Sequence, residues 1–282
     1  MHYEEERLNK IAVFGDVHGR ADMLKLLHKK IKDYGDDIEL FSCGDLIDRG
    51  DNSAGVIDYC VKNDIKAVIG NHDEWLIRLC VEFQFDPYSM QKVMGGKATA
   101  VSYGAMLANK FQKGVSNADI AEEIFRSVPK PHKDWMAKLP FYRRLTLETG
   151  EVYWILHAGL TETGAASYRK EGDSDEDMLQ NLLKTERGKD MLIWSRPNYP
   201  KTNEAARGIR RSGSEGKSDN LYSFDDGIQI FGHTIRPEAI VRKHFIALDT
   251  GCGTRNPSIL TAVILPEQVI ITVHENELKD GA

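Results

Sequence analysis

The segment Ile11-Ala12-Val13-Phe14-Gly15-Asp16-Val17-His18-Gly19 joins a short apolar run directly to residues that can bind a ligand. An apolar run bounded by glycine is typical of a buried β-strand. In layered α/β folds, ligands gather just beyond the carboxyl ends of such strands. The segment therefore predicts a strand that carries Asp16 and His18 to a binding site.

The same arrangement recurs five more times along the chain. Each time, a short apolar run ends at residues that can hold a metal or a phosphate. In a layered fold these six strand ends are expected to meet at one place. The other runs and endings are Leu40 to Cys43 before Gly44-Asp45-Leu46-Ile47-Asp48-Arg49-Gly50, Ala67 to Ile69 before Gly70-Asn71-His72-Asp73, Val152 to Leu156 before His157-Ala158-Gly159, Ile228 to Phe231 before Gly232-His233-Thr234, and Phe245 to Leu248 before Asp249-Thr250-Gly251.

Helical patterns separate the first three runs. Apolar residues recur at helical spacing over Asp22 to Ile31, Ala54 to Val61 and Trp75 to Val81. This β-α-β-α-β-α order predicts parallel strands with right-handed crossovers, as in a doubly wound α/β sheet. Ile240 to His274 alternates short strands and turns and predicts an antiparallel meander.

The chain is expected to form one catalytic domain over its 282 residues, near the upper size that one core supports. Residues 83–138 lack strand patterns and predict a helical insertion that covers one edge of the site. Residues 166–220 predict a flexible insertion. Within it, residues 197–220 are rich in Pro, Gly, Ser, Asn and charged residues, which predicts a long loop.

Composition argues against several classes of partner. The chain has 37 basic and 43 acidic residues and a net charge of -6, so no general basic surface attracts nucleic acid or anionic membrane. The charged opening, Met1 to Arg7, differs from a secretory signal, and no apolar segment approaches the length of a membrane span. We therefore expect a cytoplasmic monomer with no nucleic-acid or membrane partner. The four cysteines show no metal-binding spacing and predict reduced thiols.

The strand endings offer the ligands of two metal ions. Asp16 and His18 lie two residues apart, so in an extended chain both side chains point the same way and suit one ion. Asp45 supplies a carboxylate that can bridge two ions. Oxygen and nitrogen ligands without sulfur favour Mn²⁺, with Fe, Zn²⁺ or Ni as alternatives. The second ion is expected to bind the neutral donors Asn71, His157 and His233.

Two such ions clamp a phosphoryl group and provide a bridging hydroxide for direct attack on phosphorus. His72 is then the natural general acid for the leaving oxygen, with Asp48 orienting its imidazole. Arg49 would hold the phosphate oxygens. For a second phosphate-binding arginine we favour Arg196, which follows the apolar Ile193-Trp194 and is expected at the end of a strand. Arg207, Arg210 and Arg211 in the following loop are the alternatives.

Each motif by itself has a simpler explanation. Gly70-Asn71-His72-Asp73 could be only a turn, since Asn and Asp bond their own backbone. His157 and His233 could be buried histidines with structural hydrogen bonds. The common position after apolar strands, with complementary ligand types, favours one dinuclear site.

Together, the Gly-Asp-x-His-Gly, Gly-Asp-x-x-Asp-Arg-Gly, Gly-Asn-His-Asp, His-Ala-Gly and Gly-His-Thr blocks resemble those of the calcineurin-like metallophosphoesterases. More narrowly, they resemble the serine/threonine phosphoprotein phosphatases. Landmarks of the bacterial and phage members are similar to Gly95-Gly96 with Ser102-Tyr103-Gly104, Ile193-Trp194-Ser195-Arg196 and Asp249-Thr250-Gly251.

The resemblance implies a four-layer α/β fold, a central mixed β-sandwich flanked by helices, with the C-terminal meander supplying the second sheet. It also implies that Asp45 is shared by the two metals. The first metal would be held by Asp16, His18 and Asp45, and the second by Asp45, Asn71, His157 and His233.

By this resemblance, the expected function is hydrolysis of phosphoserine and phosphothreonine in a phosphoprotein or phosphopeptide, with phosphotyrosine and aryl phosphates as further substrates. The alternative is a symmetrical dinucleoside tetraphosphate hydrolase, which typically lacks the aspartate found here as Asp48. The related nucleases carry a histidine where this chain has Ile235. A metal-binding module without activity is disfavoured, because no expected ligand or acid is missing.

Overall fold

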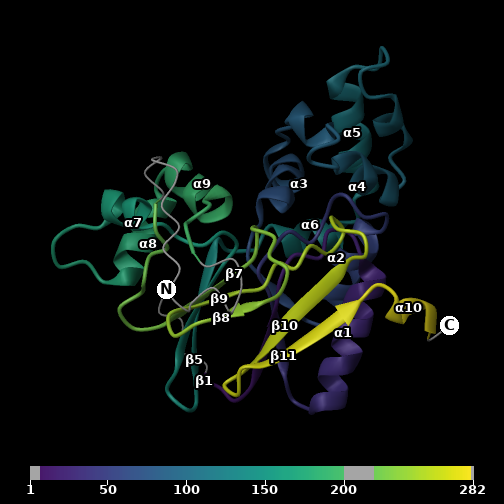
Figure 1. Ribbon diagram of the computed structural model, residues 1–282. Helices are drawn as coiled ribbons and strands as arrows, with labels where there is room; N and C mark the ends of the chain where they lie inside the picture. Colours follow the sequence, from purple (N-terminus) through teal and green to yellow (C-terminus); the bar gives the residue numbers. More distant parts are fainter. Residues whose placement is uncertain (1–6, 200–218, 281–282) are drawn as a thin grey trace, which may run out of the picture.

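The computed structural model describes residues 7–199 and 219–280. Two mixed β-sheets stack face to face, and helices cover the outer face of each (Figure 1). This arrangement gives every sheet face a partner that shields it from water. It confirms the four-layer α/β fold implied by the resemblance, in place of one doubly wound sheet.

The first sheet contains the strand that precedes Asp16, and its order is β11-β10-β2-β3-β4. β2 (Ile11–Phe14) pairs in parallel with β3 (Glu39–Ser42), which pairs in parallel with β4 (Lys66–Ala67). β10 (Ile259–Leu265) lies antiparallel between β2 and β11 (Val269–His274). The parallel order predicted for the first three strands is confirmed.

Three helices follow these parallel strands: α1 (Ala21–Tyr34), α2 (Ser53–Lys62) and α3 (Asn71–Glu82). α1 directs Leu24 and Leu27 into an apolar core shared with the sheet, as its helical spacing predicts. α3 begins at Asn71, inside the Gly70-Asn71-His72-Asp73 ending of the third apolar run. The helix therefore carries its first residues into the region beyond the strand ends.

The second sheet has the order β1-β5-β6-β7-β9-β8. Within it, β6, β7 and β9 are mutually parallel, while β5 and β8 run antiparallel to their neighbours β6 and β9. The strands are β1 (Arg7–Leu8), β5 (Tyr142–Leu147), β6 (Val152–Leu156), β7 (Ile228–Phe231), β8 (Ile240–Val241) and β9 (Phe245–Ala247). Its outer face packs against α7 (Glu162–Tyr168), α8 (Asp175–Leu183) and α9 (Glu186–Trp194).

Alternate residues of the strands fill different layers. In β2, Ile11 and Val13 face the other sheet, where they share a core with Ile155 and Ile230. Phe14 joins the core on the helix side. Because both faces are buried, the strand reads as an unbroken apolar run rather than an alternating one.

Residues 83–138 form short helices that project beyond the sandwich next to α3 (Figure 1). The helices are η1 (Pro87–Met90), α4 (Gly96–Ser102), η2 (Met106–Lys110), α5 (Asn117–Ser127) and α6 (Lys130–Met136). A last short helix, α10 (Glu277–Asp280), follows β11. The helical character expected for this segment is present, and the division into one domain with two insertions stays a prediction.

Two local expectations are wrong. The C-terminal meander does not supply the second sheet: β8 and β9 extend the sheet of β6 and β7, whereas β10 and β11 complete the sheet of β2. Residues 193–194 end helix α9 rather than a strand. Apolar runs of this length do not reveal which sheet they join, or whether they are strand or helix, because packing against distant segments decides both.

Within the described ranges, no helix is long and apolar enough to cross a membrane. All four cysteines are free, and Cys43, Cys60 and Cys252 are buried. Free buried thiols behave as small apolar side chains, in agreement with the expected reduced state.

Candidate active site

The parallel strands of both sheets end at one edge of the sandwich, and their six endings meet there. His157 Nε2, after β6, lies 3.4 Å from Asp45 Oδ1, after β3. His233, after β7, donates its backbone N–H to Asp16 Oδ1 at 3.1 Å. Asp16 and Asp45 are each at most 3% exposed. The predicted convergence of the strand ends is therefore what the fold produces.

Acceptor atoms converge around His157. Its Nδ1 donates to the carbonyl of Cys43 at 2.8 Å, which leaves a lone pair on Nε2. That Nε2 lies 3.0 Å from Asn71 Oδ1 and 3.2 Å from His233 Nδ1. Among the described residues, the buried Nε2 of His233 has no hydrogen-bond partner. A cation would satisfy the unpartnered lone pair of His233 Nε2 and the facing acceptors Asn71 Oδ1 and His157 Nε2, so these residues fit a metal ion.

A second group forms around His18. Its Nδ1 donates to the carbonyl of Ile47 at 3.0 Å, so Nε2 is again free to accept. Nε2 lies 3.6 Å from Asp45 Oδ2 and 3.9 Å from Asp16 Oδ2. Two sets of possible ligands result, His18 with Asp45 and His72, and Asp45 with His157 and His233, and Asp45 belongs to both. This geometry agrees with the expected sharing of Asp45, although it brings His72, rather than Asp16, into the first set.

The electrostatics of the site favour bound cations. Burial, with the nearby carboxylates of Asp249 and Asp45, raises the pKa of Asp16 well above its usual range. Burial and the neighbouring Asp73 do the same to the pKa of Asp45. Burial lowers the pKa of His157 to about 3 and that of His233 to about 2. Neutral imidazoles beside crowded carboxylates are the donors that divalent ions require.

Glycines let the strand endings approach closely. A Cβ on Gly232 would lie 2.0 Å from Asp16 Oδ1, and one on Gly70 would lie 2.2 Å from Asp45 Oδ1. His18, Asp45 and His233 themselves adopt positive φ angles of 46°, 52° and 64°. Left-handed backbone is costly outside glycine and persists where the surroundings hold it. The loops are therefore shaped around the ligand side chains at some cost in backbone energy.

Asp73 holds the loop that carries Asp45. Its carboxylate accepts hydrogen bonds from the backbone N–H of Asp45 (2.7 Å), Leu46 (2.9 Å) and Gly70 (3.0 Å). This role of Asp73 was not predicted from the sequence. Its position three residues after Gly70, at the start of a helix, was the available signal, because acidic residues there often bond backbone amides.

The expected acid pair is present as a hydrogen bond. His72 Nδ1 lies 2.9 Å from Asp48 Oδ2, and both residues are buried. Trp75 Nε1 donates to the same carboxylate at 3.2 Å, and Thr99 Oγ1 donates to Asp48 Oδ1 at 2.7 Å. Trp75 and Thr99 were missed, because both are far from Asp48 in sequence: α2, β4, α3 and η1 lie between Asp48 and the helix that carries Thr99.

Burial opposes charge on both members of this pair. It raises the pKa of Asp48 to about 8, and burial together with Arg49 lowers the pKa of His72 to about 3. The 2.9 Å contact between His72 Nδ1 and Asp48 Oδ2 acts in the opposite direction, because it favours a charged imidazolium beside a charged carboxylate. We take the imidazole as neutral in this arrangement, because Arg49 Nη2 donates to His72 Nε2 at 2.9 Å and so requires a lone pair there.

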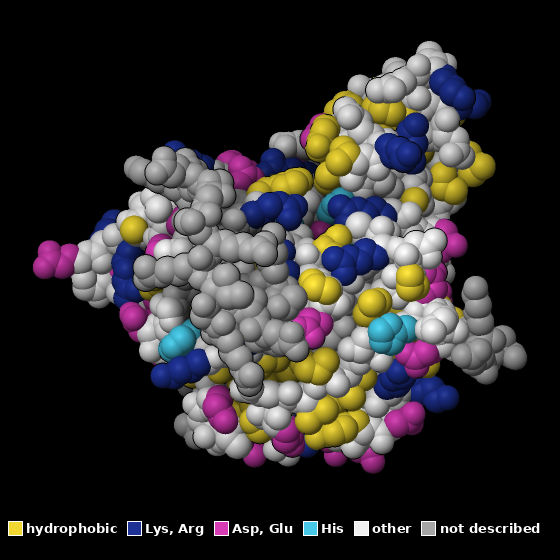
Figure 2. Space-filling model, in the orientation of Figure 1, with side chains coloured by type: hydrophobic (Ala, Val, Ile, Leu, Met, Phe, Trp, Pro, Cys, Tyr) yellow, Lys and Arg dark blue, Asp and Glu magenta, His cyan; other side chains and the backbone are white. Residues whose placement is uncertain are grey.

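The guanidinium of Arg49 lies between His18 and His72 and contacts both imidazoles. Its Nη1 donates to His18 Nε2 and to Thr254 Oγ1, both at 2.7 Å. Arg196 is also exposed, and its Nη1 lies 3.4 Å from the His233 carbonyl. Figure 2 shows basic side chains gathered beside a histidine where the projecting helices meet the sandwich. Arg196 follows α9 rather than a strand, and the alternatives Arg207, Arg210 and Arg211 lie outside the described residues.

The sixth ending places Asp249 next to Asp16. Asp249 Oδ1 accepts from the backbone N–H of Gly251 at 2.9 Å. Burial raises its pKa, and the Asp16 carboxyl hydrogen-bonds with it. A supporting role for Asp249, rather than direct metal binding, stays a prediction.

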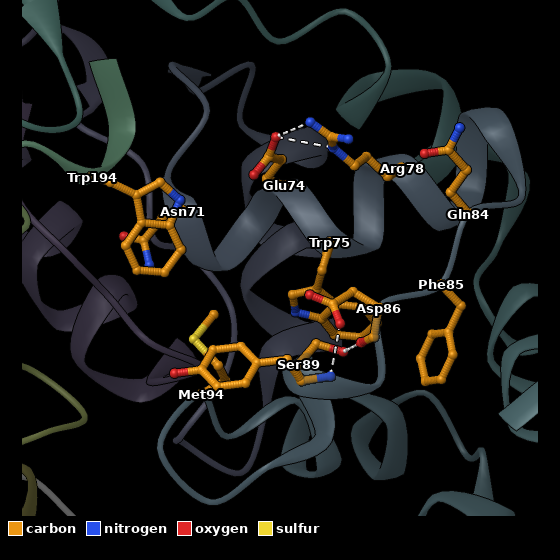
Figure 3. Close-up of a pocket in the computed structure, with 11 residues that line it drawn as sticks. Asn71, Glu74, Trp75, Arg78, Gln84, Phe85, Asp86, Ser89, Met94 and Trp194 are labelled. Carbon is orange, nitrogen blue, oxygen red and sulfur yellow. Dashed lines mark hydrogen bonds and ion pairs between the residues drawn. The ribbon is translucent and has the colours of Figure 1, made fainter. Parts of the chain in front are cut away.

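A pocket of about 250 Å³ opens beside Asn71, between α3, η1 and the end of α9 (Figure 3). Trp75 and Met94 line its inner part, and Trp194 stands next to Asn71 at its rim. The pocket adjoins the candidate metal ligands, so a substrate bound there would extend along α3.

Comparisons with known proteins agree with the site. A sequence model described as calcineurin-like phosphoesterase matches residues 9–237. A zinc-dependent endopolyphosphatase of Saccharomyces cerevisiae is 41% identical over 70 residues, which is 23% of this chain and 22% of that protein. The match therefore spans under a quarter of the yeast protein's length.

Solved structures share the fold at low identity. A crystal structure assigned to a diadenosine tetraphosphatase has a TM-score of 0.57 and 16% identity, covering 96% of this chain and 95% of that one. A serine/threonine phosphatase of Saccharomyces cerevisiae, with similarity to human phosphatase PP5, has a TM-score of 0.48 and 16% identity, covering 95% of this chain and 80% of that one.

Proposed function

Because the chain belongs to the calcineurin-like phosphoesterase family, a family of phosphoester hydrolases, we propose that it removes phosphate from phosphoserine and phosphothreonine in proteins. The observation that carries this proposal is the buried Asp48–His72 pair beside the exposed Arg49. A phosphoserine has a poor leaving group, so its hydrolysis needs a positioned acid.

The chain's own residues divide the work. Asp16, His18, Asp45, Asn71, His157 and His233 would hold two divalent ions, which supply Lewis acidity and an activated water when bound. The yeast relative is zinc-dependent, and oxygen and nitrogen ligands equally suit the Mn²⁺ expected from the sequence. We propose manganese as the native metal. Arg49, which contacts His18, and Arg196, which contacts the carbonyl of His233, would bind the phosphate oxygens.

His72 must gain a proton to act as the acid. Arg49 donates to its Nε2 in the structure, and this contact opposes protonation. A phosphate dianion would draw the guanidinium onto its own oxygens, because paired charge-assisted hydrogen bonds are stronger than one bond to an imidazole. His72 Nε2 would then be free to hold a proton, with Asp48 on Nδ1 stabilising the charge. Binding of the substrate would thus prepare its acid.

The experiment is to compare two leaving groups in His72→Asn. We expect kcat on a phosphoserine peptide to fall by about 100-fold or more, within the usual contribution of a general acid. On p-nitrophenyl phosphate, whose leaving group needs no proton, the loss should stay below about 10-fold. Equal losses on both substrates would remove His72 from the acid role.

Substrate class is tested separately with phosphoserine peptide, diadenosine tetraphosphate and inorganic polyphosphate. We expect the phosphopeptide to have the highest kcat/KM, because Asp48 and His72 suit a monoester with a poor leaving group. The structural neighbour and the yeast relative supply the two competing substrates. A higher kcat/KM on either would replace the proposal while leaving the phosphoester chemistry intact.

A further inference from the structure

The hydroxyl of Thr99 is buried against Asp48. Thr99 lies in α4 and is fully shielded from solvent. Its Oγ1 donates to Asp48 Oδ1 at 2.7 Å and accepts from the backbone N–H of Asp48 at 2.9 Å. The one hydroxyl thus grips both the side chain and the backbone of the residue that contacts His72.

Ser53 extends this contact into a chain of hydroxyls. Its Oγ lies 3.0 Å from Thr99 Oγ1 and accepts from the backbone N–H of Asp48 at 3.1 Å. The single proton of Thr99 is directed to the carboxylate, so Ser53 must be the donor toward Thr99. Each hydroxyl therefore has a defined orientation: Ser53 donates to Thr99, and Thr99 donates to the carboxylate of Asp48.

Trp75 completes the set of partners. Its indole N–H lies 3.3 Å from Oδ1 and 3.2 Å from Oδ2 of Asp48. Trp75 sits on the side of α3 that faces Ser89 and Met94 (Figure 3). The side chains of Thr99, Trp75 and His72 thus surround the carboxylate of Asp48. The backbone of Asp48 has a φ of 73°. A positive φ at a residue other than glycine costs backbone energy, so the hydrogen bonds from these neighbours must hold Asp48 in this conformation.

We propose that Thr99 is a positioning residue for the general acid, an inference that rests on the proposed function. Its hydrogen bond to Oδ1 turns Oδ2 toward His72 Nδ1 and so sets the plane of the imidazole. Without the hydroxyl, Asp48 Oδ1 loses its 2.7 Å donor and keeps only the 3.3 Å contact with Trp75 Nε1, so the carboxylate can rotate away from His72. The helical segment 83–138 then contributes to catalysis through α4, by positioning Asp48.

The test removes the hydroxyl and leaves the shape. Thr99→Val should lower kcat on a phosphoserine peptide by about 10-fold or more, as the loss of an orienting partner typically does, with KM changed by less than about twofold. On p-nitrophenyl phosphate the loss should be several times smaller. Thr99→Ser keeps the donor and should restore the ratio of the two rates.

Ser102→Ala is the matched control on the same helix. Its Oγ donates to the Thr99 carbonyl and accepts from the backbone N–H of Ala54, and neither contact reaches Asp48. We expect its ratio of rates to equal that of the parent enzyme. If Ser102→Ala shifts the ratio as Thr99→Val does, α4 acts only through its packing and the inference is wrong.

Two further variants separate the possible failures. If His72→Asn shows the leaving-group dependence and Thr99→Val does not, the inference fails and the proposed function stands. If His72→Asn shows none, the acid role itself is wrong. Should Thr99→Val not fold, Ser53→Ala decides: a smaller loss with the same substrate dependence supports the inference, and no such dependence overturns it.

Discussion

Arg49 Nη1 donates a hydrogen bond to His18 Nε2 at 2.7 Å, the same nitrogen that the proposed dinuclear site would present to its first metal. One lone pair cannot serve a guanidinium and a divalent ion together. The positively charged guanidinium of Arg49 and a divalent ion bound at His18 would also repel each other. Loading of the first metal would therefore require Arg49 to turn away from His18, toward the position proposed for the phosphate.

This exchange predicts opposite effects of Arg49→Met on two ligands. Metal binding should strengthen by about 5-fold, because the competing hydrogen bond of about 1 kcal/mol is gone. Inhibition by inorganic phosphate should weaken by about 10-fold or more, because a charge-assisted contact is lost. Isothermal titration with Mn²⁺ and inhibition assays measure the two. Weaker metal binding in the variant would show that Arg49 does not compete.

Asp45 should matter for both ions, because it belongs to both groups of possible ligands. Asp45→Asn keeps the acceptor for the backbone N–H of His72 but removes the charge. We expect both ions to be lost at metal concentrations that saturate the parent, while His233→Asn loses only one. Metal content per chain, measured after equilibrium dialysis, distinguishes them. The exposed Asp36→Asn serves as control, and a single lost ion in Asp45→Asn would contradict its sharing.

Gly232→Ala should damage the site, because the new Cβ would lie 2.0 Å from Asp16 Oδ1. Overpacking of this kind costs about 1–3 kcal/mol of unfolding free energy. Gly35→Ala, whose Cβ would lie 3.7 Å from its nearest neighbour, is the control and should change stability by less than about 0.5 kcal/mol. Urea unfolding measures both. Similar stabilities for the two variants would mean that Asp16 is not held as described.

Metal removal should cost more stability as the pH rises above about 6.5. In that range the histidines are neutral in both the folded and the unfolded chain. The raised pKa values of Asp16 and Asp45 mean that folding keeps protons which the unfolded chain has released. Stability of the metal-free protein is then present at low pH and lost as pH rises, by about 1.4 kcal/mol per pH unit for each proton.

The measurement is thermal unfolding with and without a chelator between pH 6.5 and 8, where the difference in Tm should widen. The upper limit is the raised pKa of about 8 of the neighbouring Asp48. Protons also compete less with the metal at higher pH, which works in the same direction. A difference in Tm that narrows with pH would show that the carboxylates are not the groups that repel one another.

Much of the candidate site could be predicted from the amino-acid sequence. Apolar runs that end at Gly-Asp or Gly-His identify strand ends, and parallel strands bring such ends to one edge of a fold. Asp16, Asp45, His157 and His233 could be grouped on that ground alone, and the structure brings them together. The ligand chemistry of each ending, and its place directly after an apolar run, are local properties that can be read before the packing of the layers is known.

Tertiary structure decided the remainder. Several features depend on segments far apart in sequence. They are the sheet that β10 joins, the helical conformation before Arg196, and the contacts of Thr99 and Trp75 with Asp48. Such contacts follow from how whole layers pack, which no local pattern encodes. The sequence by itself determined which ligands stand at the strand ends. The folded chain determined which way Arg49 points and what holds the acid, because hydrogen bonds between distant side chains exist only after the layers have closed.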